Sequence, residues 1–336
     1  MDFDPDAPAA PGSLYGLPFT VDAARAVVVA VPWQATTSYR RGTRDGPRAI
    51  SEASAQLDLF DVDFGAFWEQ GIAMLPEDPE LRALDLEAEP DALAVIAGDE
   101  DADALRRVNQ LGERVNGWVH SVTRRILLAG KIPAIVGGDH SVPFGAMQAV
   151  SELHPGIGVL HIDAHADLRD AYEGFVWSHA SIFHNVLHRL PGVARVVQVG
   201  VRDVGAAEVA LARALSPRVV SFYDRDLASA AAEGRPWQAV VQQIVDALPP
   251  LVWISLDIDG LDPALCPGTG TPVPGGLSFR ELTGLLVTLS RQRKIVGFDL
   301  DEVGPSEWDG NVGMRVLYKL LGASVCSGHG EPRRGL

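Results

Sequence analysis

The sequence predicts one doubly wound α/β domain, and three observations support this fold class. Short runs rich in Val and Ile recur along the chain and are apolar throughout, which is typical of parallel strands covered on both faces. Amphipathic segments with helical periodicity separate these runs. No Gly/Ser linker or internal repeat divides the chain. The repeated alternation of strand and helix therefore indicates a single, mostly parallel sheet between two layers of helices.

The expected elements follow the chain in order. The strands are expected at Ala26–Trp33, Ile132–Gly137, Ile157–Asp163, Arg195–Val201, Arg218–Tyr223, Leu251–Asp257 and Lys294–Leu300. The helices are expected at Arg106–Ala129, Val142–Leu153, Ala207–Leu215, Pro236–Leu248, Ser278–Arg291 and Val312–Leu321. Two stretches stand apart. Glu77–Asp103, rich in Asp and Glu, predicts a solvated surface insertion with a short helix, and Gly260–Gly276, rich in Gly and Pro, predicts a long functional loop.

The net charge of the chain limits the classes of molecule that it is expected to bind. The 336-residue chain carries 28 Lys and Arg against 44 Asp and Glu, a formal net charge of −16. This argues against nucleic acid, whose binding needs clustered basic residues, and against an anionic membrane surface, whereas it suits a cationic small molecule or a metal ion. No signal peptide and no apolar run of about 18 residues is present. Cys266 and Cys326 are expected to be reduced thiols, so we expect a cytoplasmic protein.

Polar residues gather where four of the expected strands end. Binding sites in open α/β sheets lie beyond the carboxyl ends of the strands. The segments at these ends are GGDHS (137–141), DAHAD (163–167), DID (257–259) and DEVGP (301–305). Residues i, i+2 and i+4 of an extended backbone share a face, so Asp163, His165 and Asp167 can converge, as can Asp257 and Asp259.

With His140 added, four carboxylates and two imidazoles surround one crevice. Buried without partners, these carboxylates would each resist desolvation strongly, whereas two divalent cations would balance their four negative charges. The donor set suits manganese, and it can also hold nickel, iron, cobalt or zinc. Taken alone, Asp167 could pair with Arg169 and Asp259 could cap the Gly/Pro loop. The three motifs together predict a metal site.

At these residues the sequence resembles the ureohydrolase superfamily of arginases, agmatinases, formiminoglutamases and related guanidino-compound hydrolases. The matching segments are GGDHS (137–141), DAHADLRD (163–170), SHAS (178–181), SLDIDGLDPALCPGTGTPVPGG (255–276), DLDEVGP (299–305) and, upstream, GTRDGPRAISEAS (42–54). The resemblance implies a single three-layer α/β/α sandwich with a mostly parallel sheet of about eight strands. It places the domain at 26–325, with the acidic insertion at 77–103, between an N-terminal extension (1–25) and a C-terminal tail (326–336).

The resemblance also implies a role for each motif residue. One cation would be held by His140, Asp163, Asp167 and Asp257, and the other by His165, Asp163, Asp257 and Asp259. Mn²⁺ is the usual metal of the family, and Ni²⁺ serves some guanidine-hydrolysing relatives. The implied reaction hydrolyses a guanidino C–N bond to urea plus an amine or ammonia. Asp167 would relay a proton, His179 would carry protons to the leaving amine, and Glu302 would hold the guanidinium.

The implied substrate is a small cationic guanidino compound, and the implied assembly is a trimer or hexamer. Leu168–Ser178 (LRDAYEGFVWS) lacks the Asn, Ser and Thr residues with which arginases hold an amino acid. The resemblance is therefore greater to agmatinase-like members and to hydrolases of free guanidine. Arg169, Phe175 and Trp177 are candidate substrate-loop residues, although the two aromatic rings could flank a cation or belong to the loop core.

Several alternatives stay open from the sequence. A formiminoglutamase would release formamide rather than urea, and an arginase would take arginine. The metal-dependent deacetylases share the sandwich but keep one zinc, and their signature lacks the histidine found here at His140. A catalytically silent relative would only bind a partner, but intact residues at all six ligand positions argue against it.

Overall fold

The computed structural model describes residues 3–10 and 12–328, so most of the predicted C-terminal tail lies outside the described residues. Eight strands form one sheet in the order β2-β1-β3-β8-β7-β4-β5-β6, and every pairing is parallel. The strands are β1 (Ala26–Val31), β2 (Ile72–Met74), β3 (Ile132–Gly137), β4 (Ile157–Ile162), β5 (Val193–Val199), β6 (Val219–Phe222), β7 (Leu251–Asp257) and β8 (Lys294–Asp301). The predicted eight-stranded sandwich is confirmed.

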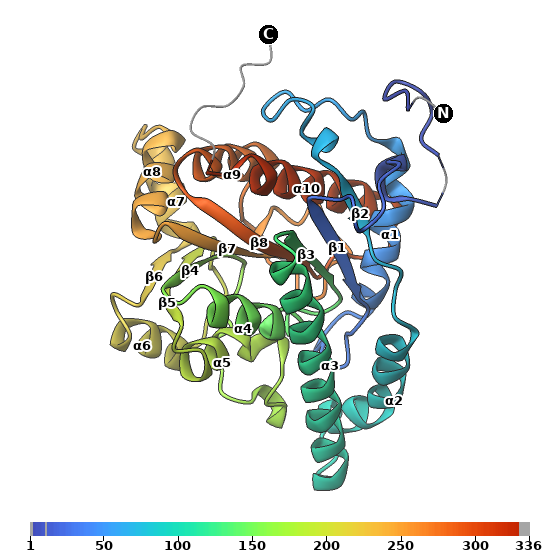
Figure 1. The fold of residues 1–336 in the computed structure, drawn as a ribbon. Helices are drawn as coiled ribbons and strands as arrows, with labels where there is room; N and C mark the ends of the chain where they lie inside the picture. The colour runs from blue at the N-terminus through green and yellow to red at the C-terminus, as the bar shows by residue number, and fades with distance from the viewer. Residues whose placement is uncertain (1–2, 11, 329–336) are drawn as a thin grey trace.

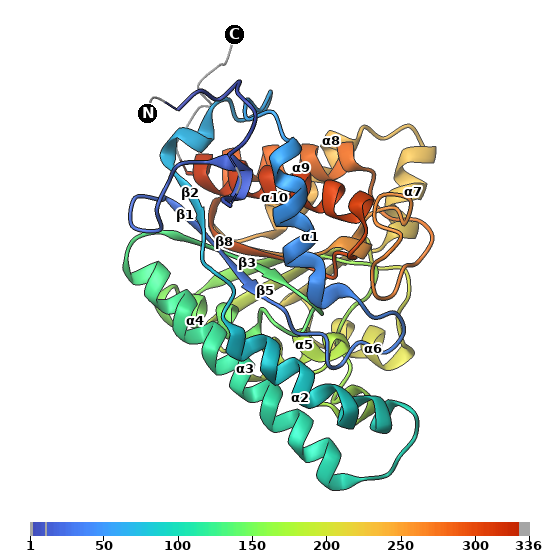
Figure 2. The same cartoon turned by 90° about the vertical axis from the view of Figure 1, so that its right-hand side faces the viewer.

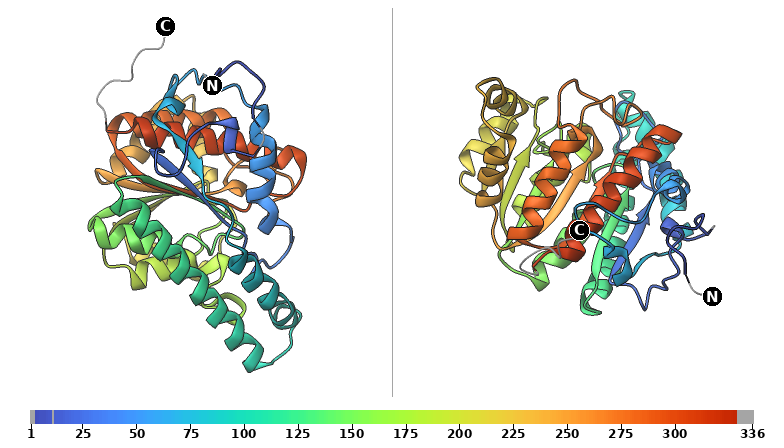
Figure 3. Two further views of the ribbon diagram at one scale, coloured as in Figure 1. Left: turned by 45° about the vertical axis from the view of Figure 1, so that its right-hand side comes forward. Right: turned by 90° about the horizontal axis from the view of Figure 1, so that it is seen from above.

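Ten helices in the described part of the chain cover the two faces of the sheet (Figure 1). They are α1 (Gly46–Ala53), α2 (Pro79–Ile96), α3 (Ala102–Leu128), α4 (Phe144–Leu153), α5 (Ile182–Arg189), α6 (Ala206–Ala214), α7 (Asp224–Ala232), α8 (Trp237–Ala247), α9 (Phe279–Gln292) and α10 (Glu307–Cys326). Helices α1 and α7–α10 lie on one face and α2–α6 on the other (Figure 3).

Each face of the sheet has its own apolar core. In β1, Ala26 and Val28 belong to one core and Val27 and Val29 to the other, because successive strand residues point to opposite faces. All six residues of β1 are buried. This double coverage explains why the strands are apolar throughout rather than alternating.

Four elements were not expected from the sequence: β2, α1, α5 and α7. Strand β2 has three residues and pairs only with β1, at the edge of the sheet. The three helices have eight or nine residues each. Fewer than three helical turns give a periodicity too short to separate from a loop.

The acidic segment differs from its expected form. Instead of a short helix in a solvated insertion, it contains the 18-residue helix α2, which extends with α3 away from the sheet (Figure 2). Leu81 and Leu84 are buried in the core on this face. Asp85 is also fully buried, and its carboxylate lies 2.6 Å from the guanidinium of Arg44. The prediction that this segment is solvated surface is therefore wrong for one side of α2.

Part of the predicted N-terminal extension contributes to the core. Leu14, Tyr15 and Leu17 are buried, and the Tyr15 hydroxyl donates a hydrogen bond to the Met314 carbonyl at 2.7 Å. Across the described residues, we find no helix with the length and apolar character needed to span a membrane.

Candidate metal centre

The four segments that carry the predicted metal ligands and Glu302 follow four adjacent strands, β3, β8, β7 and β4, in the middle of the sheet. Because these strands are parallel, their carboxyl ends meet at one edge. The turn after β3 passes close to the loop after β1, and a Cβ on Gly138 would lie 2.0 Å from the Trp33 carbonyl oxygen. Glycine at this position therefore lets the chain bring His140 over the sheet edge.

His140 faces three carboxylates. Its Nδ1 lies 2.9 Å from an oxygen of Asp163, 3.1 Å from one of Asp167 and 3.6 Å from one of Asp257. The side chains of all four residues are at most 5 % exposed. These are the four residues that the family resemblance assigns to one cation, and the structure brings their side chains together.

His165 lies beside the other two acidic positions. Its Nδ1 is 3.1 Å from an oxygen of Asp259 and 3.4 Å from one of Asp163. Asp163 thus directs one oxygen toward His140 and the other toward His165. The Asp257 carboxylate accepts a hydrogen bond from the Asp259 amide at 2.8 Å, which ties these two residues together. A carboxylate facing both imidazoles is the arrangement that two neighbouring cations require.

The buried carboxylates of this cluster are not neutralised by the protein's own positive charges. Burial and the neighbouring Asp163 raise the pKa of Asp167 to about 7. Burial, Asp259 and Asp163 raise the pKa of Asp257 well above its usual range. The residues of the cluster therefore do not compensate four ionised carboxylates by themselves, and divalent cations reverse this balance by stabilising the charged forms.

The imidazole of His140 is oriented for a ligand role. Its Nε2 lies 2.9 Å from the Ser255 hydroxyl, which donates onward to Asp299 at 2.7 Å. Since the serine proton goes to Asp299, the serine oxygen accepts the Nε2 proton. Although burial opposes it, the carboxylates of Asp163 and Asp167 at Nδ1 raise the pKa of His140 well above its usual range, and a bound cation would take the place of the Nδ1 proton. A metal-binding histidine is fixed by its other ring nitrogen in this way. The residues present fit a binuclear metal site.

His161 supports Asp163 from behind. Its Nε2 lies 2.8 Å from an Asp163 oxygen, and its Nδ1 lies 3.2 Å from the side-chain amide of Gln198. Burial lowers the pKa of His161, so the ring is neutral. A neutral ring that accepts from Gln198 at Nδ1 donates to Asp163 from Nε2. His161 thus orients Asp163.

A cavity of about 230 Å³ leads to the centre. Its lining includes His165, Asp167 and His179, all predicted site residues, and Arg169 from the predicted substrate loop. The remaining lining residues come from four connecting loops and helix α6: Ser38, Tyr39, Tyr172, Ala180, Asp203, Glu208, Thr271, Pro272 and Val273. The Gly/Pro-rich loop singled out in the sequence therefore forms one wall of this cavity.

His179 lines the cavity, and hydrogen bonds through Thr36 hold its backbone in place. Its backbone amide donates to the Thr36 hydroxyl at 3.2 Å, and that hydroxyl donates to Asp139 at 2.8 Å. The Nε2 atom lies 3.4 Å from the Ser38 hydroxyl. Burial and the charges of His165 and His140 lower the pKa of His179 to about 4. A neutral imidazole at the cavity wall can accept a proton and release it.

Glu302 and Asp167 share an uncommon backbone geometry. Their φ angles are 61° and 54°, in the left-handed region that non-glycine residues rarely adopt. Such strain concentrates at functional sites, where the surrounding structure holds it in place. One oxygen of Glu302 accepts from the His140 amide at 3.3 Å, and the other is buried without a hydrogen-bond partner among the described residues. Glu302 is buried and is not among the residues that line the cavity at His165.

The structure places Phe175 and Trp177 away from the cavity, which corrects their assignment as substrate-loop residues. Phe175 is fully buried in the core between the sheet and helices α2–α6. Trp177 packs on Phe144 at 4.9 Å between ring centroids, and the Arg189 guanidinium lies 4.9 Å from its ring. The aromatic rings therefore have the loop-core role that the sequence left open.

Sequence reasoning missed four polar residues that shape the site: Thr36, Ser38, Asp139 and Ser255. Asp139 lies inside the GGDHS motif, so its place beside a predicted ligand could have marked it as a site residue. Thr36 and Ser38 meet His179 across more than 140 residues of sequence. Ser255 is an inward residue of an apolar strand, and only its contact with His140 reveals its role.

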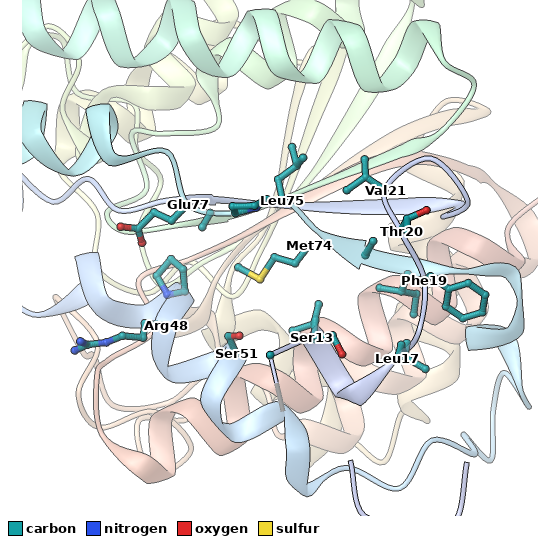
Figure 4. Close-up of a pocket in the computed structure, with 17 residues that line it drawn as sticks. Ser13, Leu17, Phe19, Thr20, Val21, Arg48, Ser51, Met74, Leu75 and Glu77 are labelled. Atoms are coloured by element: carbon teal, nitrogen blue, oxygen red, sulfur yellow. The ribbon is translucent and has the colours of Figure 1, made fainter. Parts of the chain in front are cut away.

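A second cavity, of about 540 Å³, lies at the sheet edge between β2, α1 and the N-terminal segment (Figure 4). Apolar residues dominate its lining, with Arg48 and Glu77 at one end (Figure 4). It shares no lining residue with the cavity at His165. In the described part of the chain, the clusters of His, Asp and Glu that could hold a metal lie at the carboxyl edge of the sheet and not here.

The fold and the paired His/Asp clusters define a binuclear metallohydrolase of the α/β/α class. The arginase family model matches residues 24–322, nearly the whole chain. N(1)-aminopropylagmatine ureohydrolase of Thermus thermophilus is 36% identical over 84% of each chain. Guanidinobutyrase of Pseudomonas aeruginosa is 31% identical over 90% of this chain and 88% of its own. The structure of proclavaminate amidinohydrolase from Streptomyces clavuligerus superposes with a TM-score of 0.73 at 25% identity, covering 95% and 99% of the two chains.

The chain belongs to the arginase family, and it is a metal-dependent ureohydrolase. The resemblance stated from the sequence motifs is confirmed.

Proposed function

We propose that this ureohydrolase releases urea from a small guanidino compound whose chain carries a second positive charge, as agmatine does. The reaction class is carried by one observation: four buried carboxylates and two imidazoles converge at the end of a cavity. These six residues would hold two divalent cations, with Mn²⁺ or Ni²⁺ suited to the oxygen-rich donor set, and the cations would supply a lowered water pKa and polarisation of the substrate.

The chain's own residues bind the substrate and move its protons. The unpartnered oxygen of Glu302 accepts hydrogen bonds from the guanidinium, which holds the guanidino carbon at the cluster. Asp167 takes up a proton beside that carbon. His179, neutral and at the cavity wall, takes up the proton that Asp167 gives back and passes it to the leaving nitrogen, because an amine is expelled readily only when protonated.

The charges of the cavity wall support an amine-bearing substrate. Asp203 is exposed, lines the cavity and forms a β-bridge with His165. Its carboxylate can pair with the distal ammonium of a short guanidino amine bound in the cavity. The relatives named as acting on agmatine or aminopropylagmatine agree with this choice.

Arg169 supports a second candidate, a guanidino acid of the guanidinobutyrate type, because its guanidinium also lines the cavity. This side chain, however, already lies 4.6 Å from the Tyr172 ring and 3.4 Å from the Glu208 carboxylate. Its charge is therefore partly satisfied within the protein, and we rank the guanidino acid second.

The test is urea release from protein reconstituted separately with Mn²⁺ and with Ni²⁺. The substrates are agmatine, 4-guanidinobutyrate, guanidine, arginine and formiminoglutamate. We expect agmatine to be preferred, and we expect Asp203→Asn to raise its KM several-fold without raising that of 4-guanidinobutyrate. Asp170→Asn is the matched control, since Asp170 is 83% exposed and does not line the cavity. Urea from none of the guanidino compounds would refute the proposal, and formamide release would indicate a formiminoglutamase.

A further inference from the structure

Helix α2 buries one carboxylate against the loop that forms the cavity wall. The side chain of Asp85 is fully buried. One of its oxygens accepts from the backbone amide of Gln34 at 2.7 Å, and the other accepts from the Arg44 guanidinium at 2.6 Å. A residue of the acidic segment is thereby connected to both ends of the loop formed by residues 33–45, which we call the wall loop.

Hydrogen bonds of the Gln34 side chain also join the two ends of the wall loop to each other. The side-chain oxygen of Gln34 accepts from the Gly42 amide at 2.7 Å and from the Arg44 amide at 3.3 Å. Gly42 has a φ of 128°, which glycine adopts without strain. On its far side the loop meets the Gly/Pro-rich loop, where the amide and guanidinium of Arg40 donate to the carbonyls of Gly270 and Pro267.

The wall loop carries three residues to the cavity and to His179. The Thr36 hydroxyl accepts from the His179 amide, and the Ser38 hydroxyl lies 3.4 Å from its Nε2. Tyr39 is 70% exposed and lines the cavity. No metal ligand lies on this loop, so the loop can influence substrate binding without changing the metal centre.

The ion pair between Asp85 and Arg44, at the base of the wall loop, is more deeply buried than the other ion pairs of α2. Burial raises the pKa of Asp85 to about 6, so its carboxylate is ionised at neutral pH and pairs with Arg44. Arg44 also contacts Glu89, which in turn accepts from Arg41 at 2.9 Å. Removing the Asp85 carboxylate leaves Arg44 with Glu89 alone and takes away the acceptor of the buried Gln34 amide, which disturbs the backbone at both ends of the wall loop.

We propose that Asp85 is a positioning residue for substrate binding: through Gln34 and Arg44, it fixes the wall loop that carries Ser38 and Tyr39 to the cavity. This inference rests on the proposed ureohydrolase reaction at that cavity. Asp85 does not touch the substrate. It acts by holding the wall in the geometry that the substrate meets, and small displacements of such positioning elements are costly.

The test compares Asp85→Asn with Asp91→Asn in the metal-reconstituted enzyme. Asp91 lies on the same helix and pairs with Arg107 on the exposed side, so it is a matched control. We expect Asp85→Asn to raise KM for the best substrate of the panel about tenfold or more, with kcat changed less than about threefold. Metal per chain should stay at the wild-type value. Asp91→Asn should leave all three quantities unchanged.

Hydrogen exchange supplies a readout that does not depend on turnover. Asp85→Asn should speed amide exchange in peptides covering residues 33–45 about tenfold, whereas Asp91→Asn should not. Unchanged exchange in the wall loop would overturn the inference, whatever the activity. Faster exchange with an unchanged KM would also overturn it, because the loop would then not determine substrate binding.

A milder variant keeps the inference testable if Asp85→Asn does not fold. Arg44→Lys retains the charge but loses the two-pronged contact with Asp85 and Glu89. The same rise in KM and in exchange supports the positioning role, and wild-type behaviour contradicts it. If the wild-type protein releases no urea from any guanidino compound, the proposed function fails, and the exchange experiment still decides whether Asp85 fixes the wall loop.

Discussion

The metal centre and helix α2 both concentrate carboxylates, but their charges are balanced in different ways. On α2, the buried Asp85 faces Arg44, and Glu89 faces Arg41 and Arg44. At the centre, Asp163, Asp167 and Asp257 face one another and two imidazoles, and burial raises the pKa of Asp257 well above its usual range. Acidic residues balanced by the chain's own cations build the scaffold, whereas acidic residues left unbalanced point to cations supplied from outside.

The largest expected effect comes from removing a residue of the unbalanced cluster. His165→Ala or Asp257→Asn should abolish urea release and reduce bound metal, because each position faces more than one other ligand residue. Activity assays and metal analysis check both outcomes. Asp262→Asn is the control, since Asp262 is exposed in the loop that follows Asp259. Wild-type turnover in either variant would contradict the binuclear assignment.

Glu302→Gln tests the group proposed to hold the guanidinium. Burial and the neighbouring carboxylates raise the pKa of Glu302 well above its usual range, and a bound guanidinium would favour its ionised form. The amide of Gln cannot supply that charge, so kcat/KM should fall at least about 100-fold. Metal per chain should stay near the wild-type value, because Glu302 is not among the ligand positions. A variant with full kcat/KM would show that the guanidinium is held elsewhere.

Metal affinity should fall on acidification. Although burial opposes it, the carboxylates of Asp259 and Asp163 raise the pKa of His165 to about 12, and burial raises that of Asp167 to about 7. A cation binds the deprotonated forms and displaces these protons, so affinity rises with pH by about tenfold per unit for each proton released. Titrations with Mn²⁺ between pH 6 and pH 8 measure this slope. An affinity independent of pH would conflict with the proposed ligands.

The smallest effect on activity, but a measurable one on stability, is expected on α2. Asp85→Ala removes one partner of a buried ion pair and should lower the free energy of unfolding by about 3–5 kcal/mol. Asp91→Ala should leave the denaturation midpoint nearly unchanged, because its pair with Arg107 is largely exposed. Equal losses in both variants would remove the distinction between the buried and exposed sides of the helix.

The sequence predicted the strands and the convergence of the His and Asp side chains at their carboxyl ends, because both follow from local patterns. A strand covered on both faces is apolar throughout, and D-x-H-x-D directly after such a strand has no packing explanation. The side of α2 that carries Asp85 was not predictable, since its partners Gln34 and Arg44 lie more than 40 residues away. Whether the rings of Phe175 and Trp177 face the cavity or the core was also open, because it depends on residues distant in the sequence. The loop before Phe175 and Trp177 has positive φ angles at Ala171 and Glu173, which the sequence does not mark.

Metal counting tests the central claim most directly. The wild-type protein, freed of metal and reconstituted with Mn²⁺, should retain two ions per chain after removal of excess metal. His165→Ala should retain fewer ions under the same conditions. Two ions per chain, together with urea release, would agree with a centre whose four carboxylates are balanced from outside. One ion or none in the active wild-type protein would contradict it.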